Sequence, residues 1–348
     1  MKASFYRYFL NFKIPGGTSR GVLKQKETFF LLVETAGKWG IGECGIFRGL
    51  SYDDREGYEE KLRWLCNNIS LEKDFLLREL QEFPSIQFGL EQALLSLNSP
   101  SGFDLFPSDF TRDKDSIPIN GLIWMGSEEF MKDQIEKKLQ EGFTTLKMKI
   151  GAIDFDAELS LLKRIRNRFN RSELELRVDA NGAFHPNEAL RKLEVLSRLQ
   201  IHSIEQPIKA GQIETMHNLC RLTPLPIALD EELIGVVPIE DKKKLIDAIQ
   251  PQFIILKPSL IGGFKGSEDW IGLAEDKGIG WWITSALESN IGLNAIAQFT
   301  YTLDHSVPQG LGTGSLFTNN ISCPLFVDQG ALHYSKDGKW QDVEQFLN

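Results

Sequence analysis

Cysteine is scarce in this sequence, and its placement excludes two kinds of site. The 348 residues include four cysteines, Cys44, Cys66, Cys220 and Cys323, and no two of them form a CxxC pair. Closely spaced cysteine pairs are typical of zinc sites and redox motifs. We therefore expect reduced, mostly structural thiols and no zinc site built from cysteine.

Long apolar runs and clustered positive charge are missing as well. No stretch of about 18 apolar residues occurs, which argues against a transmembrane helix. The N-terminal sequence MKASFYRYFLNFKI lacks the apolar core and the cleavage site of a signal peptide. A net charge of −9 argues against a nucleic-acid partner. We expect a cytoplasmic protein with neither a membrane nor a nucleic acid as partner, and the sequence does not indicate its oligomeric state.

The length and the texture of the chain predict two domains. A chain of 348 residues is longer than one compact core usually holds. Residues 1–112 are typical of an α+β domain, with a hairpin over ETFFLLVETAGKWGIGECG that turns at residues 36–38. Helical patterns follow at about 56–69, 72–82 and 86–97. The turn-rich segment SLNSPSGFDLFPSDFTRDKDS marks the boundary.

From residue 113 onward, short apolar runs alternate with amphipathic helical patterns. The runs are IPINGLIW, TTLKMKI, LELRVDA, HSIEQP, PIALDEEL, FIILKPS, GWWITSA and PQGLGTG. Marker residues near their ends follow at steps of 30, 26, 25, 27, 28 and 27 residues: Lys149, Asp179, Glu205, Asp230, Lys257, Ser285 and Gly312. One strand–helix unit per step predicts a (β/α)₈ barrel of the TIM type over residues 113–320. The alternative is an open doubly wound sheet, but no GxGxxG or GxxxxGK[ST] motif follows a strand.

Carboxylates stand at the ends of three consecutive predicted strands. Asp179, Glu205 and Asp230 would meet at one mouth of the barrel, where unneutralised negative charges repel one another. A hard divalent cation resolves this repulsion, and Mg²⁺ prefers carboxylate oxygens. The alternative, that each carboxylate pairs with a neighbouring cation, explains any single residue equally well but explains three in register less well.

Lysines flank these carboxylates on both sides. In TTLKMKIG, Lys147 and Lys149 alternate with apolar residues, so both would point into the barrel. Lys257, at the sixth run, would lie across the mouth. A general base needs a pKa near the working pH, so we expect neighbouring positive charge to lower a lysine pKa from about 10.4. Lys149 is nearer the strand end and is expected to transfer the proton. Lys147 is expected to lower the pKa of Lys149.

The motifs KMK, DANG, EQP, DEEL and KPS resemble those of the enolase superfamily, specifically its muconate lactonizing enzyme subgroup. The resemblance spans nearly the whole chain and implies an N-terminal capping domain, which we expect residues 321–348 to complete. It also implies a site with Mg²⁺, for which Mn²⁺ can substitute, and two acid–base lysines. The implied roles are metal ligands for Asp179, Glu205 and Asp230 (preferred over Glu232), catalysis for Lys149 and Lys257, and support for Lys147, Asn181 and Glu231.

Missing residues narrow the activity that this resemblance implies. The mandelate racemase type has a histidine on the seventh strand, where this chain has WWITSALES, and dipeptide epimerases have a DxD motif on the eighth, where it has GLGTGSLF. The segments ITSALESNIGLNAIAQ and QGLGTGSLFTNN resemble those of o-succinylbenzoate synthases. This implies dehydration of 2-succinyl-6-hydroxy-2,4-cyclohexadiene-1-carboxylate to 2-succinylbenzoate in menaquinone biosynthesis, through proton abstraction beside a carboxylate and an enediolate held by Mg²⁺.

Other activities and the residues that bind substrate stay open at this point. An N-acylamino acid racemase or a dipeptide epimerase of the same subgroup is one alternative, and a non-catalytic metal-binding barrel is another. For a small-molecule carboxylate substrate, the expected contacts are Arg20, Arg177, Ser285, Gly312 and Thr313. The segments 15–21 and 45–54 fall where the family has its specificity loops, so Arg20 or Arg48 could meet a carboxylate. The alternative, that these arginines are exposed on flexible loops and bind no substrate, explains the sequence equally well.

Overall fold

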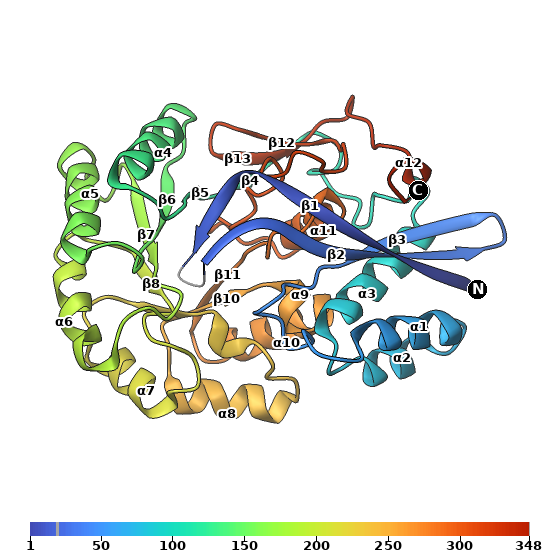
Figure 1. The fold of residues 1–348 in the computed structure, drawn as a ribbon, viewed down its shortest axis with the longest axis horizontal. Helices are drawn as coiled ribbons and strands as arrows, with labels where there is room; N and C mark the ends of the chain where they lie inside the picture. Colours follow the sequence, from blue (N-terminus) through green and yellow to red (C-terminus); the bar gives the residue numbers. More distant parts are fainter. Residues whose placement is uncertain (19–20, 348) are drawn as a thin grey trace.

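A parallel sheet that curls into a barrel forms the larger part of the structure, and a smaller antiparallel sheet lies against it (Figure 1). A computed structural model describes residues 1–18 and 21–347. The barrel strands lie in the order β11-β10-β9-β8-β7-β6-β5. Their bounds are β5 Gly121–Ile123, β6 Thr145–Lys149, β7 Glu175–Asp179, β8 Ser203–Glu205, β9 Ile227–Leu229, β10 Phe253–Leu256 and β11 Gly280–Ile283.

Helices connect successive strands and form an arc outside the barrel (Figure 1). They are α4 Glu128–Gln140, α5 Phe155–Arg168, α6 Pro186–Ser197, α7 Ile213–Leu222, α8 Ile239–Ile249, α10 Gly263–Glu275 and α11 Asn290–Thr302, with the short η1 Glu231–Leu233 and α9 Pro258–Ile261 after β9 and β10. The alternation confirms the predicted TIM-type barrel. None of the helices within the described ranges is long and apolar enough to cross a bilayer.

The eighth side of the barrel is reduced to two residues. Gln309 bridges to Ile119, just before β5, and Gly310 bridges to Thr284, just after β11. The sheet therefore closes, which excludes the open doubly wound alternative. The run PQGLGTG lies where a strand was predicted but forms bridges only, because glycines in a strand leave no side chains to pack against their neighbours.

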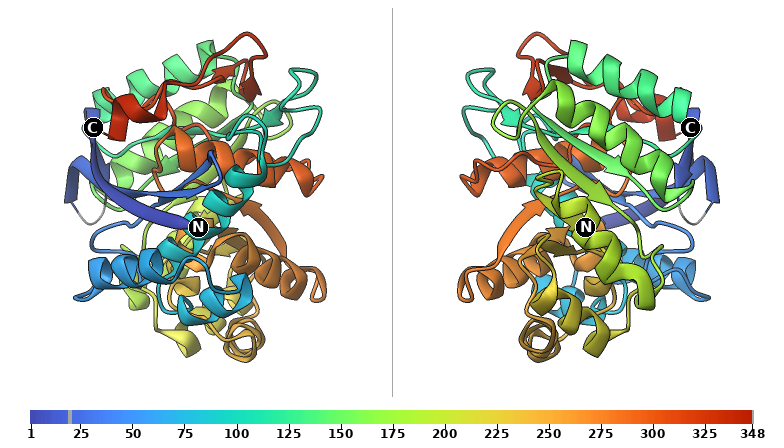
Figure 2. Two further views of the ribbon diagram at one scale, coloured as in Figure 1. Left: turned by 90° about the vertical axis from the view of Figure 1, so that its right-hand side faces the viewer. Right: turned by 90° about the vertical axis from the view of Figure 1, so that its left-hand side faces the viewer.

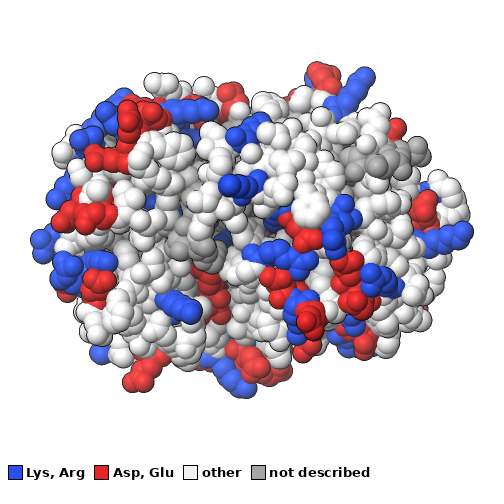
Figure 3. All heavy atoms as spheres, viewed as in Figure 1, with Lys and Arg blue, Asp and Glu red and all other residues white. Residues whose placement is uncertain are grey.

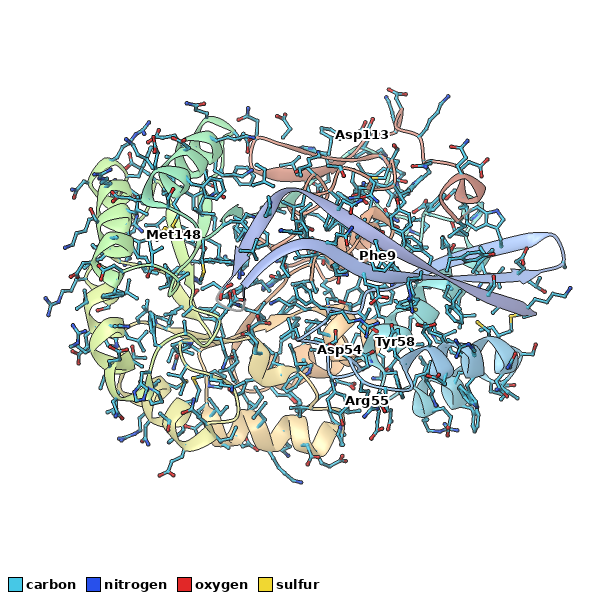
Figure 4. All side chains as sticks on the ribbon, viewed as in Figure 1. Phe9, Asp54, Arg55, Tyr58, Asp113 and Met148 are labelled. Atoms are coloured by element: carbon cyan, nitrogen blue, oxygen red, sulfur yellow. The ribbon has the colours of Figure 1, made fainter. Side chains whose placement is uncertain are left out.

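The alternating pattern of β6 separates an apolar outer face from a charged inner face. Leu146 and Met148 belong to the large hydrophobic cluster between the strands and the outer helices, and each is 1% exposed. Figure 4 labels Met148 on this strand. Burying each of these side chains stabilises the fold by about 1.5–3 kcal/mol. Lys147 and Lys149 consequently point to the barrel interior.

The N-terminal part is an antiparallel sheet covered by helices. Its strands are β1 Lys2–Thr18, β2 Gly21–Thr35 and β3 Lys38–Cys44, and its helices are α1 Tyr58–Asn68, α2 Lys73–Glu79 and α3 Pro84–Asn98. The predicted hairpin and the three predicted helices are confirmed, with the turn at Ala36 and Gly37, both of which have positive φ. The sequence analysis missed β1, because aromatic residues occupy both of its faces and hide the alternation.

Two glycines of β3 let helix α3 lie directly on the strand. A Cβ atom on Gly42 would lie 2.0 Å from the carbonyl oxygen of Gly89, and one on Gly40 would lie 2.2 Å from that of Ala93. Such distances are far inside van der Waals contact, so only glycine fits. The close approach completes a separate hydrophobic cluster that includes Phe29 and Leu90.

Two buried carboxylates of the N-terminal part bind the first turns of barrel helices. Glu43 accepts hydrogen bonds from the backbone N–H groups of Ser289 and Gly292, each at 2.9 Å, at the start of α11. Glu91 accepts one from the N–H of Phe264 at 2.6 Å, at the start of α10. Negative charge at a helix N-terminus is favourable. Burial nevertheless raises the pKa of Glu91 to about 7, against the lowering effect of these hydrogen bonds.

The C-terminal segment contacts both parts of the molecule (Figure 2). Strands β12 Leu325–Asp328 and β13 Ala331–Tyr334 form a small sheet with β4 Ile117–Pro118, which directly precedes β5 in the chain. Just before them, Phe317 bridges to Phe12 of β1. Beyond them, Trp340 leads to α12 Val343–Leu347 and stacks on Phe103 with ring centres 4.1 Å apart. The division at residues 112, 113 and 321 stays a prediction.

Candidate active site

The carboxyl ends of the barrel strands bring the predicted acidic and basic residues together. Lys149 of β6 is paired in register with Asp179 of β7, and Asp179 with Glu205 of β8. Asp230 and Lys257 directly follow β9 and β10. Because neighbouring parallel strands end at the same level, these side chains face one another at one end of the barrel, where barrel enzymes place their active sites.

Ion pairs connect the lysines to the carboxylates. Lys147 Nζ donates to Glu205 Oε2 at 2.6 Å and lies 3.3 Å from Asp179 Oδ2. Lys149 Nζ donates to the same oxygen of Asp179 at 2.8 Å. Lys257 Nζ donates to Asp230 and lies 3.7 Å from Glu205 Oε1. Each acidic side chain therefore has a cationic neighbour, although all three carboxylates are buried.

These pairs determine the protonation of the cluster. Burial acts to raise the pKa of Asp179, but the ammonium groups of Lys149 and Lys147 outweigh it and hold that pKa well below its usual range. Burial acts to lower the pKa of Lys257 and of Lys147, yet the facing carboxylates outweigh it and raise both. The lowered pKa expected for the lysine that acts as the base stays a prediction.

Asn181, Glu231 and Glu232 extend the cluster in two directions. Asn181 accepts a hydrogen bond from Lys149 Nζ at 2.6 Å and donates to Glu231 Oε1 at 3.0 Å. Glu232 instead accepts from Gln206 Nε2 at 2.9 Å and from the N–H of Gly211 at 2.8 Å. Asn181 and Gln206 both have positive φ, a strained backbone conformation of the kind that clusters at functional sites.

The donor atoms at these strand ends suit a hard divalent cation. Asp179, Glu205 and Asp230 supply only carboxylate oxygens, the ligands that Mg²⁺ prefers. Glu205 Oε1 is buried and accepts no hydrogen bond from any residue that the structure describes. In the described ranges, no three acidic, histidine or cysteine side chains already converge at metal-binding spacing. Lysine ammonium groups bind one oxygen each of Asp179, Glu205 and Asp230, so ligation through those oxygens requires the carboxylates to turn away from the lysines.

A cavity of about 440 Å³ opens above the lysines. Lys147, Lys149 and Lys257 line it, whereas the three carboxylates lie behind them. The expected capping segments reach it through Pro15 and Phe47. Its apolar wall is formed by Ile14, Leu23, Phe47, Leu50, Trp124, Phe130 and Leu287. The sequence analysis did not identify this wall, because an apolar residue in a loop gives the same signal as a core residue.

Of the expected substrate-binding residues that the structure describes, three line the cavity and Arg177 does not. Ser285, Gly312 and Thr313 form part of its wall. Arg177 is 1% exposed and does not reach it: its guanidinium donates to Glu175 and to the carbonyl of Pro308 and lies over the ring of Trp282. The register of β7 places Arg177 deeper in the barrel than Asp179, so it packs the interior instead of contacting substrate.

Of the two arginines in the capping segments, the structure describes Arg48 only, and Arg48 does not line the cavity. Arg20 lies outside the described residues. Arg48 pairs with Glu27 at 2.6 Å and with Asp54 at 2.8 Å, and its guanidinium lies over the Tyr58 ring. Asp54 and Tyr58 lie near each other where the chain enters α1 (Figure 4). These contacts hold Arg48 within the capping part.

Charges of both signs are mixed over the face of the molecule shown in Figure 3. That mixture fits the overall acidic composition and gives this face no basic patch of the kind that binds nucleic acids. The positive charge that matters for the site is the group of lysines at the strand ends.

The fold, the strand-end cluster and a match of residues 130–335 to the family described as enolase C-terminal domain-like agree: the chain belongs to the enolase superfamily. Enzymes of this superfamily use a divalent metal ion. The chain is 48% identical to an o-succinylbenzoate synthase of Desulfotalea psychrophila, over 96% of this chain and 99% of the relative.

Solved structures agree with this placement. The crystal structure of MenC from Desulfotalea psychrophila matches with a TM-score of 0.85 at 45% identity, covering 96% of this chain and 99% of that one. A muconate lactonizing enzyme from Pseudomonas fluorescens matches with a TM-score of 0.86 at 23% identity, covering 99% and 97%. The second likeness shows a shared fold alone.

Proposed function

We propose that this chain catalyses the dehydration of 2-succinyl-6-hydroxy-2,4-cyclohexadiene-1-carboxylate to 2-succinylbenzoate, a step of menaquinone biosynthesis. The observation that supports it best is the pair of lysines, Lys149 and Lys257, which face one cavity from strands β6 and β10 beside the carboxylate cluster. Proton removal next to a carboxylate needs a base on one side and positive charge for the developing anion. The similarity to the Desulfotalea psychrophila enzyme supports the choice of substrate.

Lys149 is the residue to which we assign proton transfer. As a neutral amine it takes the proton on the carbon that carries the ring carboxylate, and the C–H electrons enter the ring system. As an ammonium it then returns that proton to the departing hydroxyl group, which leaves as water while the ring becomes aromatic. Asn181 and Asp179 orient its amine, because both accept hydrogen bonds from Nζ.

Lys257 is the residue to which we assign charge stabilisation. Burial acts to lower its pKa, but the facing carboxylates of Asp230 and Glu205 raise it, which favours the ammonium form. An ammonium group stabilises negative charge that develops on the substrate across the cavity. With these roles the dehydration needs one base, whereas a racemisation needs two.

Asp179, Glu205 and Asp230 are the residues that would hold Mg²⁺, with Mn²⁺ as a substitute. Bound there, the ion supplies Lewis-acid stabilisation of the substrate carboxylate and of the negative charge that spreads onto it. The remaining work belongs to the protein: the lysines move the proton, and the capping residues at the cavity exclude water from it.

The decisive experiment follows the ultraviolet absorbance of the aromatic product. Purified protein with Mg²⁺ should form 2-succinylbenzoate, the chelated protein should not, and added Mg²⁺ should restore the rate. Absence of product under all three conditions would refute the proposed reaction. Continued turnover in Lys149→Ala would refute the assigned base.

A second measurement separates dehydration from racemisation. Each enantiomer of an N-succinylamino acid is incubated in D₂O, and exchange of the α-proton is followed by NMR. A racemase exchanges both enantiomers through two bases, and it needs Lys257 as much as Lys149. Efficient exchange of both enantiomers together with no dehydration would replace the proposal by the racemase activity.

A further inference from the structure

A chain of hydroxyl groups on the cavity wall ends at a carboxylate that the cavity does not reach. Thr313 Oγ1 donates to Ser285 Oγ at 2.9 Å, and Ser285 Oγ donates to Glu288 Oε2 at 2.6 Å. Glu288 also accepts from Ser259, which follows Lys257 by two residues. Ser285 and Thr313 line the cavity, whereas Glu288 is fully buried behind them.

The direction of these hydrogen bonds is fixed by chemistry. An ionised carboxylate accepts hydrogen bonds and donates none, so the single hydroxyl proton of Ser285 must be donated to Glu288. The Ser285 oxygen accepts from Thr313 and also from the N–H of Leu287 at 3.1 Å, which fills both of its lone pairs. Thr313 in turn spends its proton on Ser285. Both hydroxyl protons therefore point away from the cavity.

The surroundings of Glu288 keep this arrangement in place. A Cβ atom on Gly45, in the capping part, would lie 3.1 Å from Glu288 Cγ and 3.3 Å from Ser259 Cβ, so the capping loop closes tightly over the carboxylate. Leu287, next to Glu288, has a φ of 66°. A non-glycine residue holds such a conformation only where its surroundings impose it.

We propose that Glu288 is a positioning residue that makes the Ser285–Thr313 wall an acceptor of hydrogen bonds, so that Thr313 Oγ1 receives the ring hydroxyl of the substrate. This inference rests on the proposed function. No residue in the described part of the chain donates to Thr313 Oγ1, which leaves its lone pairs for a ligand. The ring hydroxyl is the only hydrogen-bond donor of the dicarboxylate substrate at neutral pH.

The polarity of the wall has a consequence for each end of the reaction. A hydroxyl that donates to Thr313 turns its own lone pairs away from that wall, which leaves them available to the ammonium of Lys149. The product has two carboxylates and a ketone and no donor, so it gains nothing from Thr313. In this arrangement the hydroxyl protons of Ser285 and Thr313 are not available to the second carboxylate of the substrate.

The test compares substrate turnover with product affinity in Glu288→Gln and in Thr313→Val, which keeps the side-chain shape and removes the oxygen. Each change should lower kcat/KM about three- to ten-fold, the size of one neutral hydrogen bond. The inhibition constant of 2-succinylbenzoate should stay within about two-fold of wild type. Thr313→Ser retains the acceptor and should restore the rate, which keeps the test valid if Glu288→Gln does not fold.

A double-variant comparison measures whether Glu288 acts through Thr313. If it does, Glu288→Gln combined with Thr313→Val loses no more activity than Thr313→Val alone. Glu43→Gln is the matched control. The Glu43 carboxylate is as buried as that of Glu288 and also lies at the start of α11, but it accepts hydrogen bonds from Ser289 and lies outside the hydroxyl chain. The loss caused by Thr313→Val should be the same with and without Glu43→Gln.

The outcomes separate this inference from the proposed function. A wild-type protein that forms no 2-succinylbenzoate refutes both. Two results with an active wild type would refute the inference alone. One is that Glu288→Gln and Thr313→Val lose product affinity in parallel with turnover. The other is that the two losses of activity multiply in the double variant. Loss of turnover with unchanged product affinity and no further loss in the double variant supports it.

Discussion

Two glycine-to-alanine substitutions in this chain should change stability in opposite directions. In Gly42→Ala the new methyl group would lie 2.0 Å from the carbonyl oxygen of Gly89 and 2.8 Å from the backbone nitrogen of Ala93. Both are backbone atoms, so no side chain can rotate away, and helix α3 must move about 1 Å from β3 to reach a tolerable distance. A gap of that size forfeits about a quarter to a half of the dispersion energy of each affected contact.

The expected cost of Gly42→Ala follows from this geometry. Overpacking in a well-packed core costs about 1–3 kcal/mol, and separating α3 from the strand adds lost contacts, so we expect about 3 kcal/mol or more. Gly272, in the last turn of α10, is the matched control, because a Cβ there has no atom within 4 Å. Alanine is favoured over glycine in a helix by about 0.5–1 kcal/mol, so Gly272→Ala should stabilise the protein.

Urea denaturation followed by circular dichroism measures both free energies of unfolding under the same conditions. The slope with urea should be equal for the two variants and the wild type, which makes the midpoints comparable. A Gly42→Ala protein within about 1 kcal/mol of wild type would show that α3 has room to accommodate the methyl group, and the account of the glycine contact would be wrong.

Three further predictions concern the buried carboxylates and the lysines. Glu43→Ala leaves the N–H groups of Ser289 and Gly292 buried without their acceptor, which costs about 1–3 kcal/mol for each group. Thermal denaturation should therefore show a marked loss of stability, whereas the control Glu79→Ala, at an exposed position, should show none. The pKa of Glu91, ordinarily 4.5, is raised to about 7 in the folded protein, so the unfolded state binds fewer protons between these values. The free energy of unfolding should therefore fall by up to about 3 kcal/mol as the pH rises through this window, and Glu91→Gln should remove that slope in denaturation at pH 5 and pH 8. Lys149→Arg should abolish dehydration in the ultraviolet assay, and Lys147→Arg should only weaken it or shift its pH profile; an equal loss in both would mean that the roles of the two lysines are ranked wrongly.

The sequence predicted the barrel and the position of its strand ends because the step between them is set by geometry. One strand and one helix need about the same number of residues each time, so the spacing of Asp179, Glu205 and Asp230 identifies them as residues at strand ends. The alternation in β6 likewise predicted the inward direction of Lys147 and Lys149, since a strand has only two faces.

Other features depend on distances that no spacing contains. The direction of the Lys257 pKa shift follows from burial and from the carboxylates that face it, whose distances the spacing does not contain. Arg177 shares a strand face with Asp179 but lies a layer deeper, where it donates to Glu175 and to the carbonyl of Pro308, and the spacing does not contain these contacts. Glu288 was hidden within an apolar segment, although an acidic residue in such surroundings is a signal that a buried partner must exist.

The two-residue closure of the barrel has a consequence for how the chain folds during synthesis. Gln309 and Gly310 join β11 to the residues before β5, and Phe317 joins β1, so both contacts link positions far apart along the chain. Until these late residues leave the ribosome, the nascent barrel exposes two unpaired sheet edges, which invite pairing with other chains. Closure is therefore a late, non-local event, and such contacts are slow to form.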